Sequence, residues 1–191
     1  MSMKVIGTDG SLGHPNRGMT LLSSVSIAAG ATDVSFTSIP QIYTDLMVVI
    51  KNIQQSASTS GSAAIIRFNS DATAGNYRFK ASGLITSTAT ELSAATATAY
   101  GTQSNRDIAI FVGDAPAGSN AGGTSTIIIR GYAGSGYKPV VAWAYAGQAL
   151  TFSSFTNGSY ISSSPITSIS FTRNGTGFTY SSGIVELWGV I

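Results

Sequence analysis

Short runs in which apolar and polar residues alternate recur along most of the chain, with turn residues between them. In Thr32–Ile39, Val34 and Phe36 alternate with polar neighbours, and Ile166–Arg173 alternates in the same way. This period of two is typical of strands with one buried face. No segment sustains the i, i+3, i+4, i+7 apolar spacing of an amphipathic helix. The pattern therefore predicts an all-β chain.

The predicted strands continue to the last residues of the sequence. They are Met19–Ile27, Thr32–Ile39, Asp45–Ile53, Ala63–Asn69, Tyr77–Leu84, Arg106–Gly113, Ser125–Tyr132, Val140–Gln148, Ile166–Arg173 and Ile184–Ile191. Ala89–Tyr100 is rich in Ala, which suits a short helix, and in Thr, which suits a loop or strand. Many short strands without a confident helix favour an antiparallel β-sandwich or a barrel, here one domain over residues 19–191.

The last predicted strand, Ile184–Ile191, is apolar on both faces. A strand of this kind belongs inside a sheet, between two neighbours and covered on both sides, and its Glu186 must reach solvent or a partner. Asp45–Ile53 is a similar run that suits a central strand. The residues predicted to form the structural core are Val48, Ile66, Phe68, Ile128, Trp143, Phe171, Leu187 and Trp188.

Residues 1–18 lack any periodicity and hold four Gly and one Pro. They are predicted to form an extended N-terminal arm, with a disordered terminus as the alternative. If the arm binds a partner, the residues expected to contact it are Lys4, Val5, Ile6, His14 and Arg17. Two Asn-Gly pairs further along, Asn157-Gly158 and Asn174-Gly175, are typical of tight turns.

Charge and composition narrow the class of protein. Charged residues make up 9% of the chain, against about 25% in typical soluble domains. The ten Lys and Arg residues are scattered singly, so nucleic-acid binding is not expected. There is no apolar run long enough to span a bilayer and no signal-peptide pattern, so no membrane partner is expected. With no cysteine, disulfides and thiol chemistry are excluded.

Motifs that carry catalytic chemistry are missing from the sequence. The single histidine, His14, lies in the predicted arm, where a general base would be poorly oriented. Nothing singles out a catalytic pair among the eight carboxylates, and no metal-binding spacing occurs. Gly131–Lys138 lacks the spacing of a phosphate-binding loop. We therefore predict no catalytic residue, metal or cofactor, and no enzymatic activity.

Aromatic residues allow two interpretations. They could line a surface that stacks on sugars or bases, or they could pack the core of a sandwich and its rim, as most aromatic side chains do. The residues concerned are Tyr77, Phe79, Tyr132, Tyr137, Trp143 and Tyr145.

Several stretches, in their order along the chain, resemble a family of virion proteins of tailed bacteriophages. They are "LLSSVSIAAGATDVSFTSIP" (Leu21–Pro40), "SIPQIYTDLMVVIKN" (Ser38–Asn52), "IRFNSDATAGNYRF" (Ile66–Phe79) and the ending "GIVELWGVI". That ending resembles the family's usual "LYGI", with Trp188 in place of Tyr and Val190 in place of Ile. The likeness is patchy between Ala81 and Pro139.

The resemblance implies a jelly-roll-like antiparallel β-sandwich, located in the virion. The leading hypothesis is a capsid decoration (cement) protein that binds across neighbouring subunits of the major capsid protein, or other virion subunits, as a homotrimer or homodimer. A tail or fibre-associated module that binds a receptor or glycan is the alternative. A carbohydrate-active enzyme on a jelly roll is the third hypothesis.

Overall fold

The structure is a computed structural model that describes residues 18–56, 63–73, 75–86, 98–103, 108–111, 122–146, 151–173 and 179–191. Within these ranges every regular element is a β-strand, and all the strand pairings are antiparallel. The all-β prediction is confirmed. The strands are β1 (Met19–Ser26), β2 (Asp33–Phe36), β3 (Asp45–Gln55), β4 (Ala63–Phe68), β5 (Tyr77–Thr86), β6 (Thr98–Gln103), β7 (Ile108–Phe111), β8 (Gly123–Arg130), β9 (Lys138–Ala146), β10 (Thr151–Tyr160), β11 (Ile169–Arg173) and β12 (Tyr180–Val190).

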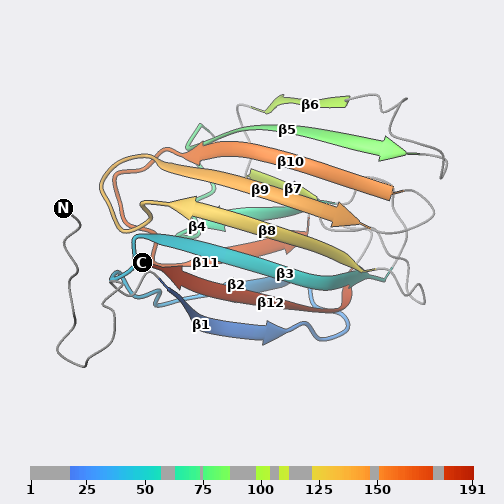
Figure 1. Cartoon of the computed structure of the whole chain (residues 1–191), viewed down its shortest axis with the longest axis horizontal. Coiled ribbons are helices and arrows are strands. Elements are labelled where there is room, and N and C mark those ends of the chain that lie inside the picture. The colour runs from blue at the N-terminus through green and yellow to red at the C-terminus, as the bar shows by residue number, and fades with distance from the viewer. Residues whose placement is uncertain are drawn as a thin grey trace, which may run out of the picture.

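The strands form two sheets that pack against each other (Figure 1). The large sheet has eight strands in the order β1-β12-β3-β8-β9-β10-β5-β6, and the small sheet has four in the order β2-β11-β4-β7. Paired strands are β1 with β12, β2 with β11, β3 with β8 and β4 with β7. The two halves of the chain thus pair like one long hairpin that has been rolled up, which is the jelly-roll arrangement. The sandwich prediction is confirmed.

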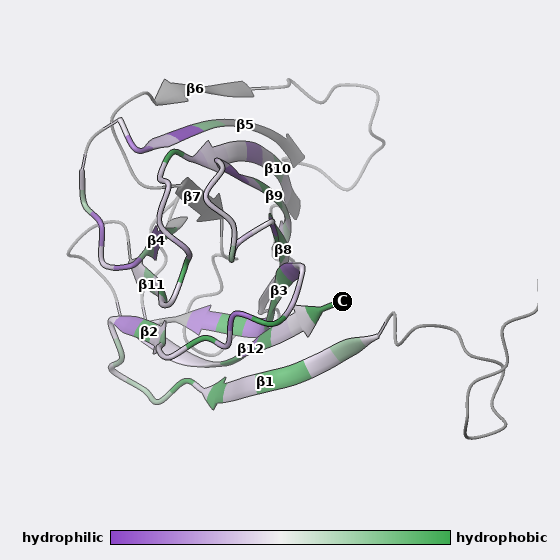
Figure 2. Ribbon diagram, turned by 90° about the vertical axis from the view of Figure 1, so that its left-hand side faces the viewer, coloured by the Kyte–Doolittle hydropathy of each residue, from purple (hydrophilic) through white to green (hydrophobic). Residues whose placement is uncertain are grey.

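Four further strands extend the large sheet beyond β8. The pair β9 and β10 lies between β8 and β11 in the sequence, and β5 and β6 lie between β4 and β7. Figure 2 shows that the large sheet bends around the small one, from β1 through β3 and β8 to β10. The inner face of the large sheet is therefore concave and covered, and its outer face is convex.

The hydrophobic core fills the space between the sheets. Five of the residues predicted for it, Val48, Ile66, Phe68, Phe171 and Leu187, are buried there. They come from β3, β4, β11 and β12, and they share the core with Tyr77 and Tyr180, whose rings are almost fully buried. Because side chains alternate along a strand, one residue in two of the large sheet faces this core.

The core prediction was wrong for three residues. Trp143 is exposed, and Ile128 and Trp188 are only partly buried, because all three project from the outer face of the large sheet. Their neighbours Ile127, Ala142 and Leu187 occupy the inner face instead. The strands concerned are apolar on both faces, so hydrophobicity alone does not show which set of residues faces the small sheet.

The last strand lies between two neighbours, β1 and β3, as predicted, but the prediction that both its faces are covered was wrong, because Trp188 is only partly buried and Ile184 is exposed on the outer face. One other prediction fails in the same half of the chain. Asn157-Gly158 is no turn but lies inside β10, a strand that the sequence pattern did not predict. A Cβ on Gly158 would stand 2.4 Å from the carbonyl oxygen of Arg78, so this glycine permits the close approach of β5. Asn174-Gly175 falls outside the described residues.

Several loops are fixed at the end of the sandwich where β10 and β12 finish. The Asp71 carboxylate accepts hydrogen bonds from the Thr73 amide (2.8 Å), the Asn76 side chain (2.7 Å) and the Tyr160 hydroxyl (3.0 Å). Burial opposes ionisation of Asp71, but hydrogen bonds from Thr73, Asn76 and Tyr160 outweigh it and lower its pKa to about 2. The Tyr77 hydroxyl donates to the Asp71 carbonyl at 2.8 Å.

A buried lysine fastens the next loop. The Lys138 side chain is fully buried, and its Nζ donates to the carbonyl oxygens of Ser162 (2.6 Å) and Ser164 (2.7 Å). Burial lowers the pKa of Lys138 because the charged form loses its hydration. The two carbonyl oxygens compensate part of that loss. The buried position of Lys138 is therefore explained by its role in holding the loop at Ser162 and Ser164.

Candidate interaction surface

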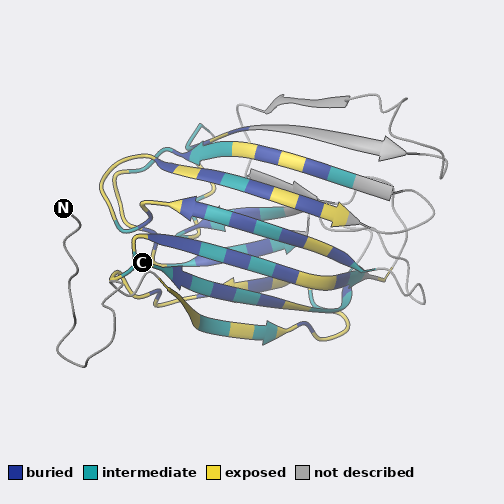
Figure 3. Cartoon of the chain, viewed as in Figure 1, coloured by how far each residue is buried: buried dark blue, intermediate teal, exposed yellow. Residues whose placement is uncertain are grey.

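The outer face of the large sheet carries several exposed, large apolar side chains, among them Leu21, Trp143 and Tyr145. We define the outer face as the outward-pointing residues of β1, β12, β3, β8, β9 and β10. Strand register decides which residues share it, because residues directly opposite each other in paired strands project to the same side. Figure 3 shows the alternation of buried and accessible residues along these strands.

One row of residues across the outer face is apolar over five neighbouring strands. Leu21 of β1 lies opposite Trp188 of β12, and Trp188 lies opposite Met47 of β3. The row continues through Ile128 of β8 to Val141 of β9. Leu21 is exposed and the other four are partly buried. The small sheet packs on the opposite, inner face, and none of the other described strands lies over this row (Figure 2).

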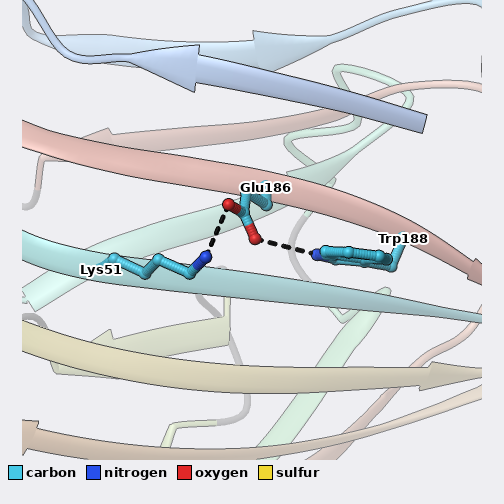
Figure 4. A network of polar contacts seen from close by, with 3 residues as sticks. All are labelled: Lys51, Glu186 and Trp188. Carbon is cyan, nitrogen blue, oxygen red and sulfur yellow. Dashed lines mark hydrogen bonds and ion pairs between the residues drawn. The ribbon is translucent and has the colours of Figure 1, made fainter. Parts of the chain in front are cut away.

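The adjacent row carries an ion pair set among apolar residues. Glu186 lies opposite Val49, and its carboxylate receives Lys51 Nζ at 2.6 Å. Its second oxygen accepts a hydrogen bond from Trp188 Nε1 at 3.1 Å (Figure 4). The hydrogen bond from Lys51 lowers the pKa of Glu186, and the bond from Trp188 acts in the same direction. Glu186 thus has the polar partner expected for a charged residue in an apolar strand, Lys51, and its hydrogen bond also orients the Trp188 ring.

A second ion pair stands at the end of β3. Arg130 Nη1 lies 2.7 Å from the Asp45 carboxylate, which also accepts a hydrogen bond from the Gly131 amide at 2.9 Å. Asp45 is 7% exposed and Arg130 is exposed. Each of these two charge pairs on the outer face is internally compensated, so the face offers a partner apolar area with little unpaired charge to desolvate.

Three aromatic side chains gather on β9 and β10, in the extension of the jelly roll. Trp143 lies opposite Phe155, with ring centroids 5.7 Å apart, and Tyr145 follows two residues later on the same face. Trp143 is 47% exposed, Tyr145 53% and Phe155 38%. Large aromatic side chains that stay in water are typical of surfaces that bind partners.

The aromatic residues considered in the sequence separate into two groups. Tyr77, Phe79 and Tyr132 are buried, whereas Tyr137, Trp143 and Tyr145 are exposed. Tyr132 donates its hydroxyl hydrogen to the Pro40 carbonyl, and the Tyr77 hydroxyl donates to the Asp71 carbonyl. Only the second group is available to a ligand or partner. Phe155 was missed, because β10 was not predicted as a strand.

The described residues hold no group of three or more His, Asp or Glu side chains that could bind a metal. No helix that could cross a bilayer occurs in the described ranges. The arm residues Lys4, Val5, Ile6, His14 and Arg17 fall outside the described part of the chain, so their predicted contacts are not placed. The exposed apolar side chains of the described surface are available to bind a partner.

Comparison of the chain with models of known protein families, with curated proteins and with solved structures gives no match.

Proposed function

We propose that this protein is a structural component of a tailed-bacteriophage particle, a capsid decoration protein that binds across neighbouring shell subunits. The observation that carries the proposal is the outer face of a charge-poor jelly roll, with its apolar row across five strands and its exposed aromatic side chains. Jelly rolls are common in viral capsids. The sequence resemblance to phage virion proteins supports the same class of protein.

The proposed mode of action is passive. A protein that binds the assembled shell, but not its separated subunits, shifts the equilibrium towards the shell by mass action. The outer face suits this role, because burying Trp143, Tyr145 and Leu21 against a neighbour removes apolar surface from water. The paired charges Lys51–Glu186 and Asp45–Arg130 need not be separated when the face is covered. No catalytic step is part of the proposal.

Particles made with and without this chain test the proposal. We expect particles that lack the chain to assemble but to release their genome at a lower temperature, and added protein to restore the midpoint. Immunogold labelling of complete particles should mark the shell. Complete particles that contain none of the chain, or shells equally stable without it, would refute the proposal.

A second candidate function is glycan binding by a module of the tail or its fibres. The observation in its favour is the group Trp143, Tyr145 and Phe155, since exposed aromatic rings provide amphipathic platforms. Jelly rolls also occur among lectins.

Labelling and binding measurements separate the two candidates. Gold label confined to the tail, together with binding to a glycan array that Trp143→Ala abolishes, would establish the second candidate. Gold label on the shell, together with a glycan array that gives no signal, would support the first candidate, a capsid decoration protein.

A further inference from the structure

Strand β1 leaves one edge of the large sheet open. It pairs with β12 on one side, and among the described residues no strand pairs with its other side. Open edges present unpaired backbone groups, and proteins commonly protect them with short strands, charges or proline. The small-sheet edge β2 follows that rule, since it has four residues and begins with Asp33. β1 has eight residues and neither charge nor proline.

Burial also distinguishes β1 from the other strands. None of its residues is buried, whereas each other strand with described side chains has at least two buried residues. Met19 is 53% exposed and Leu21 47%. Leu22 and Val25 pack only partly against the core. A further strand beside β1 would cover the flanks of these side chains and pair the open backbone groups.

The local charge pattern points to a second copy of this chain as that strand. In a two-fold contact the same patch of both subunits meets, so a charged residue near the axis faces its own copy. From Gly18 to Thr32 the sequence contains no charged residue. Two β1 strands can therefore approach each other without repulsion between like charges. Two copies of β2 would be less favourable, because each begins with Asp33.

We propose that two copies of this chain pair through β1, antiparallel and about a two-fold axis, to form one continuous sheet. A bulge at Leu22 divides β1, because Leu21 lies opposite Trp188 and Ser23 opposite Leu187. The regular stretch Ser23–Ser26 is thus the part that pairs. The partner is a second copy whether or not the protein belongs to a virion.

This pairing also bears on the outer face. Leu21 stands in the apolar row beside Trp188, at the β1 edge. Pairing through β1 places the outer faces of two copies side by side on one surface. A particle or other large target could then be bound at two points at once, which raises the overall affinity.

Oligomeric state tests the proposal directly. Light scattering during size-exclusion chromatography should give a dimer for the whole chain, and Ser24→Lys should give a monomer, because lysine on an edge strand blocks pairing. The matched control is Ser35→Lys, which adds the same charge at an exposed serine of the other edge, β2. The control should remain a dimer. Circular dichroism and the unfolding temperature verify that both variants fold.

Cysteine substitution locates the axis, since the chain has no cysteine of its own. We expect Ser23→Cys, Ser24→Cys and Ser26→Cys to form disulfide-linked dimers under mild oxidation with different yields. The yield should be highest at one position and fall with distance from it, because antiparallel strands bring only the axial residue close to its own copy. Ser35→Cys is the control and should stay monomeric on a non-reducing gel.

Three results would overturn the proposal. One is a wild-type chain that stays monomeric at every soluble concentration. Another is a dimer that survives Ser24→Lys but is lost with Trp143→Ser, which would place the contact on the outer face. The third is cross-linking at Ser35→Cys that equals the highest yield among the three β1 positions, which would reflect random collision.

Discussion

The two faces of the large sheet are built from the same strands but differ in what covers them. On the inner face, Leu187, Val48 and Ile127 are buried against the small sheet. On the outer face, Trp188, Met47 and Ile128 come from the same three strands, and no described element covers them. Both faces carry apolar side chains, so the presence of apolar residues by itself does not show which face belongs to the core.

The comparison separates apolar side chains that folding buries from apolar side chains that folding leaves partly in water. An apolar side chain stabilises the fold in proportion to the area that folding removes from water. Trp143 and Tyr145 keep about half of their surface in water, so folding gains only part of the stabilisation that full burial would give. A partner that covered them would remove the remaining apolar surface from water. Substitutions on the two faces should therefore have separable effects, on stability for the inner face and on binding for the outer face.

The largest loss of stability is expected for Leu187→Ala on the inner face. Truncating a fully buried leucine removes apolar contacts and leaves a cavity, which lowers the free energy of unfolding by about 2–5 kcal/mol. Urea denaturation followed by fluorescence measures this loss. A change below about 1 kcal/mol would mean that Leu187 is not part of a tightly packed core.

A smaller loss of stability is expected for Asp71→Asn. Asp71 lies on neither face of the large sheet but in a loop at the end of the sandwich, where its carboxylate accepts hydrogen bonds. The pKa of Asp71 is about 2 in the folded chain, below the unfolded value, so ionisation stabilises the fold. After discounting for solvent screening, the contribution is about 1 kcal/mol. It should be fully present above pH ~4 and disappear as the pH falls towards 2.

Urea midpoints of the wild type and Asp71→Asn, measured across this pH range, check that expectation. The difference between the two proteins should be largest near neutral pH and shrink in acid. A difference that does not depend on pH would show that the Asp71 charge is not what stabilises the loop.

A still smaller effect is expected for the ion pair on the outer face. The lowered pKa of Glu186 implies a stabilisation that is present above the ordinary carboxyl pKa and is lost as the pH falls through the lowered value. A double-mutant cycle with Lys51→Met and Glu186→Gln isolates the coupling. The coupling should weaken with added salt, because the Lys51 side chain is half exposed. A coupling that salt leaves unchanged would contradict an exposed pair.

A smaller effect on stability than for Leu187→Ala is also expected for Trp143→Ser on the outer face. Trp143 keeps 47% of its surface in water and packs only against one side, where it meets Phe155, so its truncation should lower the free energy of unfolding by about 1 kcal/mol. The same urea titration used for Leu187→Ala provides the comparison. If the two substitutions were equally destabilising, the distinction between the two faces would fail.

Periodicity in the sequence predicted the fold class and most strands, because alternation is enforced wherever one face is buried. β2 and β11 show this plainly, with Val34, Phe36, Ile169 and Phe171 on the buried side. β10 was not predicted, because its sequence TFSSFTNGSY holds the polar Ser154 and Thr156 at its buried positions. The Asn-Gly pair in the same strand imitates a turn.

The outer face could not be predicted from the sequence, because it depends on which strand lies beside which. In β9 the larger residues Val141, Trp143 and Tyr145 project outwards while Ala142 and Ala144 face inwards. A reading that assigns the larger apolar residues to the core therefore chooses the wrong face. The ion pair between Lys51 and Glu186 joins positions 135 residues apart, and only the pairing of β3 with β12 reveals it.

The most direct test of the outer face as the contact surface is rebinding to particles that lack the chain. Purified wild-type protein and the double variant Trp143→Ser, Tyr145→Ser would be mixed with such particles and sedimented. We predict that the wild type sediments with the particles, and that the double variant stays in the supernatant although circular dichroism shows it to be folded. Equal sedimentation of the two proteins, or failure of the wild type to bind, would contradict the account.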